Sequence, residues 1–437
     1  MRYYKSFFIV FIIFVVGCFS CEKSGQFSYL NPSKAVIYEE TQILKTYPFS
    51  DPNPIPNIGR IYPYFKFDGY TNHAIDQSWK MVVMENEYLK VFISPEIGGK
   101  IWGAIEKSTG KEFLYKNEVV KFRNIAMRGP WTSGGLEFNF GDIGHAPSCS
   151  TPVDYSLKKN ADGSVSCIVG AYDLPSRTRW NVKITLPKDK AFLETTVSWF
   201  NLTDEYTSYY HWMNAAAKAS GNLEFFYPGK DFIGHGGEPS SWPISSGRDL
   251  SKYENNDFGG YKSYHVVNAY ADFFGGYWKE DDFGFGHHTD YDVKPGKKLW
   301  IWGLSQQGMI WEDLLTDNDG QYVEYQSGKL FNQAAEESAY SPFKHRSFGP
   351  HVADVMKEIW FPLKSTKGMV AASKYAVLNV EEERDSVHIY LSALQHLKDT
   401  IYMQIGNKKI NYSVDLSPLE ITKWTLAKPE DAFFKIK

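Results

Sequence analysis

The stretch RWNVKITLPKDKAFLETTVSWFNLT (179–203) decides the fold class of this chain. Each half alternates β-branched or aromatic residues with polar ones, which is the pattern of a half-buried β-strand. The PKDK between the halves consists of turn-forming residues, so the stretch predicts an antiparallel hairpin. Similar runs are SVSCIVGAYDL (164–174) and LWIWGLS (299–305), and turn sequences such as NADG, NLTDE and KPGKK lie next to such runs.

Hairpins at short intervals with weak helical periodicity predict an all-β fold class: a large antiparallel β-sandwich over residues 35–380. A short helix-like run occurs at NQAAEES (332–338). Strand-like runs continue after it and predict a small C-terminal β extension or small sandwich over 381–437. Residues 228–265 are rich in Gly, Ser, Pro and Asn, so they are either a functional lid or decoration between strands.

The composition narrows the function classes. The net charge of −4 gives no sign of a nucleic-acid partner. Aromatic residues make up 16% of the chain, with 13 Trp and 29 Tyr, and many fall in strand-like runs. Sugar-binding sites use such rings, because the C–H face of a pyranose packs on an aromatic plane while its hydroxyls reach polar side chains. The alternative is that most of these rings belong to the sandwich core.

The N-terminus is typical of an exported protein. Arg2 and Lys5 precede FFIVFIIFVVGCFSC (7–21), an apolar segment too short to span a bilayer comfortably. The VVGC within it resembles a bacterial lipobox, which implies cleavage and lipidation at Cys18, with Cys21 as the second choice. We therefore expect residues 1–21 to be a lipoprotein signal peptide, 22–34 a linker, and the mature protein to be lipid-anchored in the cell envelope of a Gram-negative bacterium. A plain secretory signal or an uncleaved anchor is the alternative.

A polar site is predicted by GQYVEYQSGKL (320–330). Glu324 and Gln326 lie two apart in a strand-like run, so they share one face, and Lys329 follows the break at Gly328. A carboxylate inside a sheet needs a partner, so this face suits the floor of a polar cleft better than a core. His211 lies in a second aromatic strand, and a carboxylate with an imidazole suits acid/base chemistry.

Three segments resemble the galactose mutarotase-like superfamily, and more closely an uncharacterised bacterial family within it whose members often carry helical repeats after the sandwich. SPEIGGKIWGAIEKSTGKEFLY (94–115) is similar to its opening hairpin, NLTDEYTSYYHWMNAA (201–216) to the strand with its acid histidine, and YVEYQSG (322–328) to the strand with its base glutamate. The resemblance implies a mutarotase-like supersandwich with His211 as acid, Glu324 as base and Gln326 beside it.

The chain departs from the mutarotase pattern in two places. Asn214 lies three residues after His211 rather than four, and the substrate-binding histidine has no clean counterpart. Instead GPWTSGGLEFNFGDIGHAPS (129–148) offers Glu137 and His145. Glycoside cleavage normally uses two carboxylates, for which Glu324 and Glu137 are the obvious pair. Arg128, His287 and His288 are candidates for holding sugar hydroxyls or a sugar carboxylate, although adjacent strand residues face opposite ways, so one of the two histidines is expected to be structural.

The sequence thus predicts an exported protein that binds a mono- or oligosaccharide and acts at its anomeric centre, as a glycoside hydrolase or an aldose 1-epimerase. The alternative is a non-catalytic sugar-binding or scaffold lipoprotein. The predicted catalytic residues are Glu324, His211 and Glu137, and the predicted binding residues are Arg128, His145, Asn214, His287, His288, Gln326 and Lys329. We expect no cofactor and no nucleic-acid partner. No CxxC or Cys/His ligand spacing occurs, so we expect no zinc and assign no metal site, and calcium bound through backbone and carboxylate oxygens is left open.

Overall fold

The computed structural model describes residues 34–53, 55, 65–124, 129–141, 144–145, 147–302, 304–331, 347–405, 408–428 and 434–436. The predicted signal peptide with Cys18 and Cys21, Arg128 and the helix-like run at 332–338 lie outside these residues. Residues 32–437 form one compact unit. Within the described residues, no helix is both long and apolar enough to cross a membrane.

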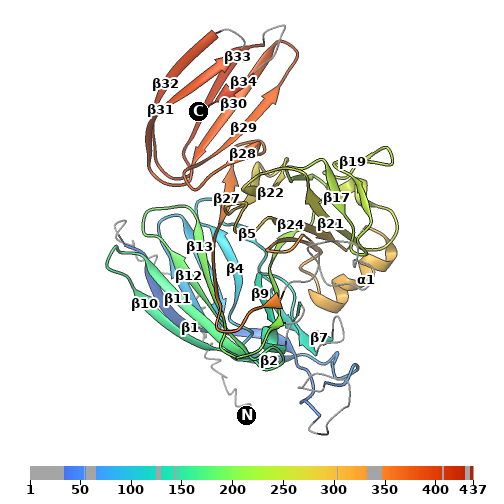
Figure 1. The fold of residues 1–437 in the computed structure, drawn as a ribbon. Coiled ribbons are helices and arrows are strands. Elements are labelled where there is room, and N and C mark those ends of the chain that lie inside the picture. Colours follow the sequence, from blue (N-terminus) through green and yellow to red (C-terminus); the bar gives the residue numbers. More distant parts are fainter. Residues whose placement is uncertain are drawn as a thin grey trace, which may run out of the picture. The chain divides into compact units, whose positions relative to one another are not determined.

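Two large β-sheets make up the main part of the fold, as the sequence predicted (Figure 1). The larger sheet has 13 strands, in the order β18 (Pro239–Ser241), β17 (Asp231–Ile233), β21 (Lys262–Val267), β24 (Gly296–Ile301), β25 (Tyr322–Gly328), β15 (Tyr210–Lys218), β9 (Leu136–Gly141), β4 (Lys100–Glu106), β3 (Leu89–Ser94), β2 (Ile75–Glu85), β1 (Val36–Tyr47) and β6 (Val119–Lys121), with β5 (Lys111–Leu114) beside β4. Among the described residues, its strand pairings are antiparallel except for β1 with β6.

The second sheet has eight strands and includes the hairpin from which the fold class was predicted. Its order is β10 (Asp154–Lys159), β11 (Val165–Asp173), β12 (Thr178–Leu186), β13 (Leu193–Asn201), β27 (Ala353–Lys364), β23 (Phe283–His288), β22 (Phe273–Trp278) and β16 (Leu223–Phe226). In β13 buried and half-buried residues alternate strictly, so this strand has one face on the core and one toward water.

One apolar cluster fills the space between the two sheets, which makes the fold a sandwich. The larger sheet contributes residues such as Phe138, Met213 and Tyr325, and the smaller sheet contributes residues such as Trp180 and Trp360. The central strands of the larger sheet are buried on both faces: every residue of β9 and β25 is buried. The face of these strands that points away from the sandwich core is therefore buried as well, and it carries the candidate site.

The C-terminal strands form two further small sheets. One has the order β28 (Ala371–Ala372), β29 (Ala376–Glu382), β30 (Ser386–Ala393) and β33 (Ile421–Ala427), and the other β32 (Lys408–Leu416), β31 (Leu397–Ile405) and β34 (Phe434–Ile436). The small C-terminal β extension is thus present, but β29 runs across the predicted boundary at residue 380, so its first sheet begins at β28.

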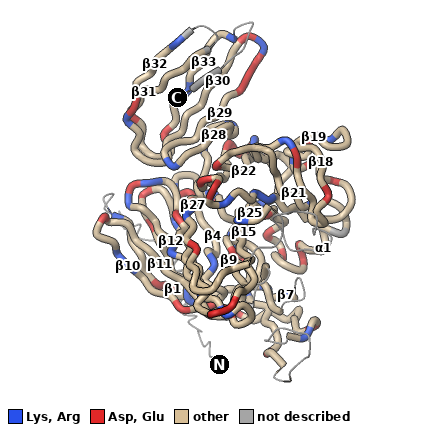
Figure 2. Tube along the Cα trace, viewed as in Figure 1, with Lys and Arg blue, Asp and Glu red and all other residues tan. Residues whose placement is uncertain are grey.

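Short elements complete the fold. They are the strand pairs β14 (Thr207–Ser208) with β26 (Ser347–Phe348), β19 (Ile244–Ser245) with β20 (Arg248–Asp249), and β7 (Arg123–Asn124) with β8 (Pro130–Trp131), the 3-10 turns η1 (Pro147–Ser150) and η2 (Tyr253–Asn256), and the helix α1 (Gln306–Leu315). The sequence did not predict α1. Charged positions of both signs are interspersed along the trace (Figure 2), in line with the small net charge.

Candidate active site

Five neighbouring strands of the larger sheet carry a row of polar and aromatic residues on the face that points away from the sandwich core. We call these ten residues the polar face: Ser263 and His265 on β21, Lys298 and Trp300 on β24, Glu324 and Gln326 on β25, Trp212 and Asn214 on β15, and Glu137 and Asn139 on β9. Cα pairing places Asn214 opposite both Glu137 and Gln326, so these three lie in one line across the sheet.

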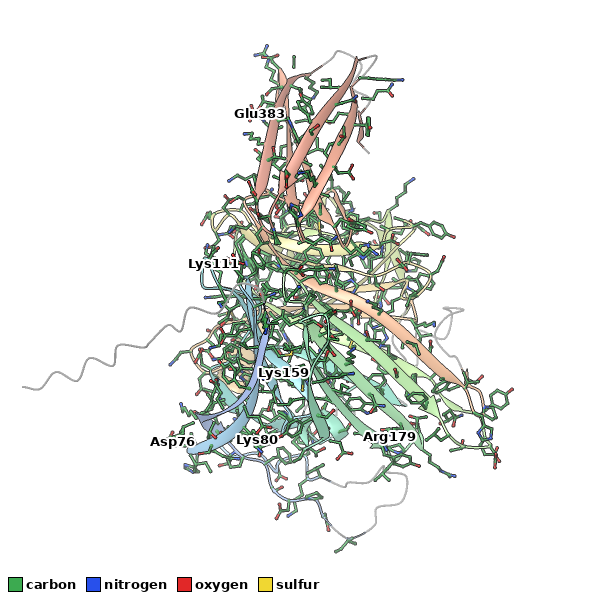
Figure 3. The ribbon with its side chains drawn as sticks, turned by 90° about the vertical axis from the view of Figure 1, so that its left-hand side faces the viewer. Asp76, Lys80, Lys111, Lys159, Arg179 and Glu383 are labelled. Carbon is green, nitrogen blue, oxygen red and sulfur yellow. The ribbon has the colours of Figure 1, made fainter. Side chains whose placement is uncertain are left out.

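Burial makes the charges of the polar face unusual. The side chains labelled in Figure 3 include ordinary surface charges such as Asp76, Lys80 and Arg179, all exposed. Glu137 and Glu324, in contrast, are only 2% and 5% exposed. Since an isolated buried charge is costly, each of these carboxylates needs partners or must take up a proton.

Glu324 is the carboxylate that holds its proton more strongly. Its Oε2 accepts a hydrogen bond from Gln326 Nε2 at 2.8 Å. Burial raises the pKa of Glu324 above the ordinary carboxyl range, with a smaller contribution from the Glu137 carboxylate, while the charges of His145 and Lys298 act against this rise. A carboxyl group with a raised pKa is suited to donate a proton near neutral pH.

Glu137 is held in the ionised form. Its Oε2 accepts a hydrogen bond from Trp131 Nε1 at 2.8 Å, and its Oε1 lies 3.0 Å from His145 Nδ1. Burial acts to raise the pKa of Glu137, but His145, the nearby Lys100 ammonium and the Trp131 hydrogen bond together lower it to about 2. Burial acts to lower the pKa of His145, and the Glu137 carboxylate outweighs this effect, so that the pKa of His145 is raised.

Asn214 lies between the two carboxylates. Its Nδ2 is 3.4 Å from Glu137 Oε2, and a side-chain hydrogen bond from Asn214 also acts on Glu324. The Oδ1 atom of Asn214 is buried without a hydrogen-bond partner, which leaves an acceptor for a hydroxyl group.

Buried lysines and tryptophans complete the site. Burial lowers the pKa of Lys298, while the charge of the Glu324 carboxylate acts to raise it. Lys100 Nζ donates to the backbone carbonyls of Thr132 and Ser133 at 3.1 and 3.0 Å, which fixes this ammonium near Glu137. Trp212 and Trp300 each have a buried indole N–H without a hydrogen-bond partner.

The predicted placement of His211 beside Glu324 is wrong. His211 and Asn214 are three residues apart on β15, so they face opposite sides of the sheet, and it is Asn214 that lies on the polar face. The His211 ring stacks on Phe140 in the core, 4.6 Å between centroids, and is fully buried. Burial lowers its pKa well below the usual range, so His211 is neutral at physiological pH.

Three predicted binding residues also lie away from the polar face. His287 is buried between the sheets and contacts Glu358 Oε2 at 2.7 Å, while His288 faces the other way, as the alternation of strand residues requires. Lys329 forms an ion pair with Asp354 of the smaller sheet at 3.1 Å. Glu324, Gln326, Asn214, Glu137 and His145, by contrast, are brought together as predicted.

Sequence reasoning missed Lys298, Trp300, Trp212 and His265. The signal was present, because Lys298 and Trp300 alternate in KKLWIWG (297–303) and Trp212 lies two residues before Asn214 in HWMN (211–214). A lysine or tryptophan two residues from a site residue on the same strand shares its face. Among the described residues, no group of three or more His, Cys, Asp or Glu side chains is arranged to hold a metal ion. Cys149 and Cys167 are buried free thiols.

Several solved structures of other proteins match this chain. A structure of a TPR-domain containing protein from Parabacteroides distasonis matches with 24% identity and a TM-score of 0.67, over 76% of this chain and 56% of that one. This chain thus spans little more than half of that protein's length. Galactose mutarotase-like proteins from Lactobacillus casei and Clostridium acetobutylicum each match with 11% identity and a TM-score of 0.46, over 64% and 65% of this chain and 99% and 96% of theirs.

The predicted resemblance is confirmed to this extent: galactose mutarotase-like structures are among those that match the chain. These matches describe a fold and assign no activity. The family described as a domain of unknown function, DUF5107, matches residues 56–363, well over half of the sequence and the whole of the polar face. The chain therefore belongs to the DUF5107 family.

Proposed function

We propose that this protein binds a mono- or oligosaccharide on the polar face and cleaves a glycosidic bond there, with Glu324 as general acid and Glu137 as the ionised carboxylate. The observation that carries the proposal is the pair of buried carboxylates on one sheet face whose environments drive their pKa values apart. Such a pair is what glycoside hydrolysis requires. One carboxyl group protonates the leaving oxygen as the glycosidic bond breaks. The ionised carboxylate either takes a proton from the water that attacks the anomeric carbon, or attacks that carbon itself to form an ester that water then hydrolyses.

The surroundings of the pair support a sugar as ligand. The half-buried Trp300 supplies aromatic surface, and the unpartnered Asn214 Oδ1 and the indole N–H groups of Trp212 and Trp300 supply an acceptor and donors. Aromatic planes together with a few fixed polar groups are the usual composition of a sugar site. The Lys298 amine next to Glu324 offers one more donor for a hydroxyl group.

A second reaction at the same site is interconversion of sugar anomers. It needs an acid at the ring oxygen and a base at the anomeric hydroxyl. The contact between His145 and Glu137 favours this candidate, because it places an imidazole, 25% exposed and with its pKa raised by the Glu137 carboxylate, on the polar side of the sheet. His145 would then take the role that the sequence gave to His211.

One experiment separates these functions from a binding-only role. The full chain is incubated with a panel of plant and host glycans. Release of reducing ends measures hydrolysis, NMR of the anomeric protons measures interconversion, and calorimetry measures binding. We expect reducing ends from at least one glycan with wild-type protein and with the exposed-site control Glu87→Gln, and none with Glu137→Gln. Binding without turnover would contradict the catalytic proposal and favour the binder.

Export and membrane attachment belong to the same proposal. We propose that the chain is lipidated at Cys18, or at Cys21, and is held at the cell envelope, because VVGC follows a charged and then an apolar segment. Changing both cysteines to Ala is expected to move the protein from the membrane fraction to the soluble fraction. Retention in the membrane fraction would contradict lipidation.

A further inference from the structure

A hollow lies beside the polar face, at the end of the larger sheet. It has a volume of about 820 Å³ and is walled by β17, β21 and the segment between them, including Phe232, His235, Glu238, Arg248, Phe258, Tyr261 and Ser263. Its volume is in the upper part of the range of about 300–1,000 Å³ that is typical of ligand sites. The stretch that the sequence left open as lid or decoration therefore forms the wall of a cavity.

The cavity continues the polar face across neighbouring strands. Ser263 lines the cavity and is paired with Trp300, and Trp300 is paired with Glu324 on the next strand. The Tyr261 ring, also in the cavity wall, stacks on Trp300 with 4.5 Å between centroids and 11° between planes. One aromatic stack thus leads from the carboxylate pair to the cavity.

The cavity wall is fixed by specific contacts. Lys262 Nζ donates to the carbonyls of Phe258 and Gly260, which holds the turn that presents Phe258 and Tyr261. Tyr264 donates to Asn256 Oδ1 at 2.8 Å, and Asn256 in turn caps the carbonyls around η2. A wall held in this way loses little conformational freedom when a ligand binds.

The chemistry of the wall fits uncharged sugar units. Tyr261 is 53% exposed with one face stacked on Trp300, so an aromatic surface remains for the C–H face of a pyranose. Phe258 is 40% exposed, and the Arg248 and Lys262 cations lie over its ring. Ser263 Oγ is buried without a hydrogen-bond partner and can meet a hydroxyl group. Arg248 is ion-paired with Asp257, which neutralises its charge and leaves donors for hydroxyl groups rather than a site for a carboxylate.

We infer that this cavity is a subsite for the further units of a neutral oligosaccharide whose terminal or cleaved unit lies on the polar face. The inference rests on the proposed function and names its substrate class: a chain of several neutral sugars. The stacked rings of Trp300 and Tyr261 lie where that chain passes from the polar face to the cavity. A single monosaccharide bound on the polar face makes no contact with the cavity.

Calorimetry on the full chain tests this inference with named probes: cellohexaose, xylohexaose, mannohexaose and maltohexaose, each beside its own monosaccharide. We expect at least one hexasaccharide to bind about tenfold or more tightly than its monosaccharide, since one well-packed aromatic contact contributes about that much. Tyr261→Ala is expected to lower this ratio by about tenfold. The control Tyr270→Ala, at a tyrosine that is 90% exposed and does not line the cavity, should leave the ratio unchanged.

The outcomes separate the two proposals. Equal affinity for a hexasaccharide and its monosaccharide, both weakened by Trp212→Ala, would overturn the cavity subsite and leave the proposed function standing. A wild-type ratio in Tyr261→Ala, with its melting temperature unchanged, would also overturn the subsite. If neither hexasaccharides nor monosaccharides bind, both proposals are wrong.

Discussion

At the scale of single residues, two carboxylates on one sheet face differ in charge because their neighbours differ. Glu137 has a histidine, an indole N–H and an amide around it, whereas Glu324 accepts a side-chain hydrogen bond from Gln326 and interacts with the charge of Lys298. The same burial therefore leaves one group ionised and drives the other toward its acid form. This difference is the basis of the proposed acid catalysis.

His145 controls the proton affinity of Glu324 in a predictable direction. The positive charge of His145 acts to lower the pKa of Glu324, so its removal in His145→Gln raises that pKa further. If protonated Glu324 is the acid, the rate falls as pH rises through this pKa. The alkaline limb of the kcat/KM profile is therefore expected to move to higher pH. If the alkaline limb of His145→Gln lies at the same pH as in the control His288→Gln, or at a lower pH, this role of His145 is contradicted.

Glu358 joins the two sheets and is predicted to carry stability. It is buried between them, with Lys294 Nζ at 2.5 Å, His287 Nε2 at 2.7 Å and Ser327 Oγ at 2.5 Å. Glu358→Gln leaves the Lys294 ammonium buried without its counter-charge, so the free energy of unfolding should fall by about 3–5 kcal/mol.

Urea unfolding followed by circular dichroism measures the effect of Glu358→Gln. The control is Glu194→Gln on the neighbouring strand β13, whose partner Lys357 is 63% exposed. Loss of that surface pair should change the free energy of unfolding by less than about 1 kcal/mol. Equal effects of the two substitutions would show that the buried network is not what holds the sheets.

Residue spacing predicted part of the site and could have predicted more. Glu324 and Gln326 share a face because they are two apart, as the sequence indicated. The same rule separates His211 from Asn214, which are three apart, so family resemblance misled where spacing did not. The contact between His145 and Glu137 depends on a loop that turns back through a positive φ of 56° at His145, and strand periodicity does not predict such a turn.

At the scale of elements, close packing of two strands sets the position of an aromatic ring on the polar face. A Cβ atom added at Gly328 on β25 would lie 2.5–2.8 Å from ring atoms of Trp212 on β15. Gly328→Ala must therefore displace the indole ring, and we expect sugar affinity to fall by about tenfold with a loss of about 1–3 kcal/mol in stability.

Calorimetry with a bound glycan and tryptophan fluorescence measure this displacement. Gly349→Ala is the control, because its added Cβ would make only ordinary contacts, 3.5 Å or more from its neighbours. Unchanged affinity in a folded Gly328→Ala variant would exclude Trp212 from the ligand contact.

The sequence predicted the long strands well and missed the short elements. Long alternating strands such as β12 and β13 were clear, because nine residues give several periods. The helix α1 was missed: its ten residues, QQGMIWEDLL, include a glycine and begin with two glutamines, so its apolar period is weak. The strands β17 to β20 have two or three residues each and are too short to show any period.

At the scale of the whole molecule, the sandwich and the C-terminal sheets share an apolar cluster. Val377 and Leu394 pack with sandwich residues such as Phe192 and Phe361, and the Ala191 N–H donates to the Leu394 carbonyl at 2.8 Å. Leu394→Ala is expected to lower the free energy of unfolding by about 2–5 kcal/mol. The loss should appear in the transition of the sandwich.

Thermal unfolding of Leu394→Ala beside Leu174→Ala tests this coupling, because Leu174 is 60% exposed and its truncation should cost little. If the C-terminal sheets unfold in a separate transition and the melting temperature of the sandwich is unchanged, this coupling is contradicted. The sequence predicted these sheets but not their boundary. Strand patterns mark elements, whereas the division between sheets depends on pairings between distant residues.

The central claim is that Glu324 supplies the proton in a reaction at the polar face, and one substitution tests it most directly. Glu324→Gln keeps the shape of the side chain and the contact with Gln326 while removing the acid. On any glycan that the wild type cleaves, the account predicts a fall in kcat of at least about 10²-fold with the dissociation constant nearly unchanged. Turnover by Glu324→Gln at the wild-type rate would contradict it.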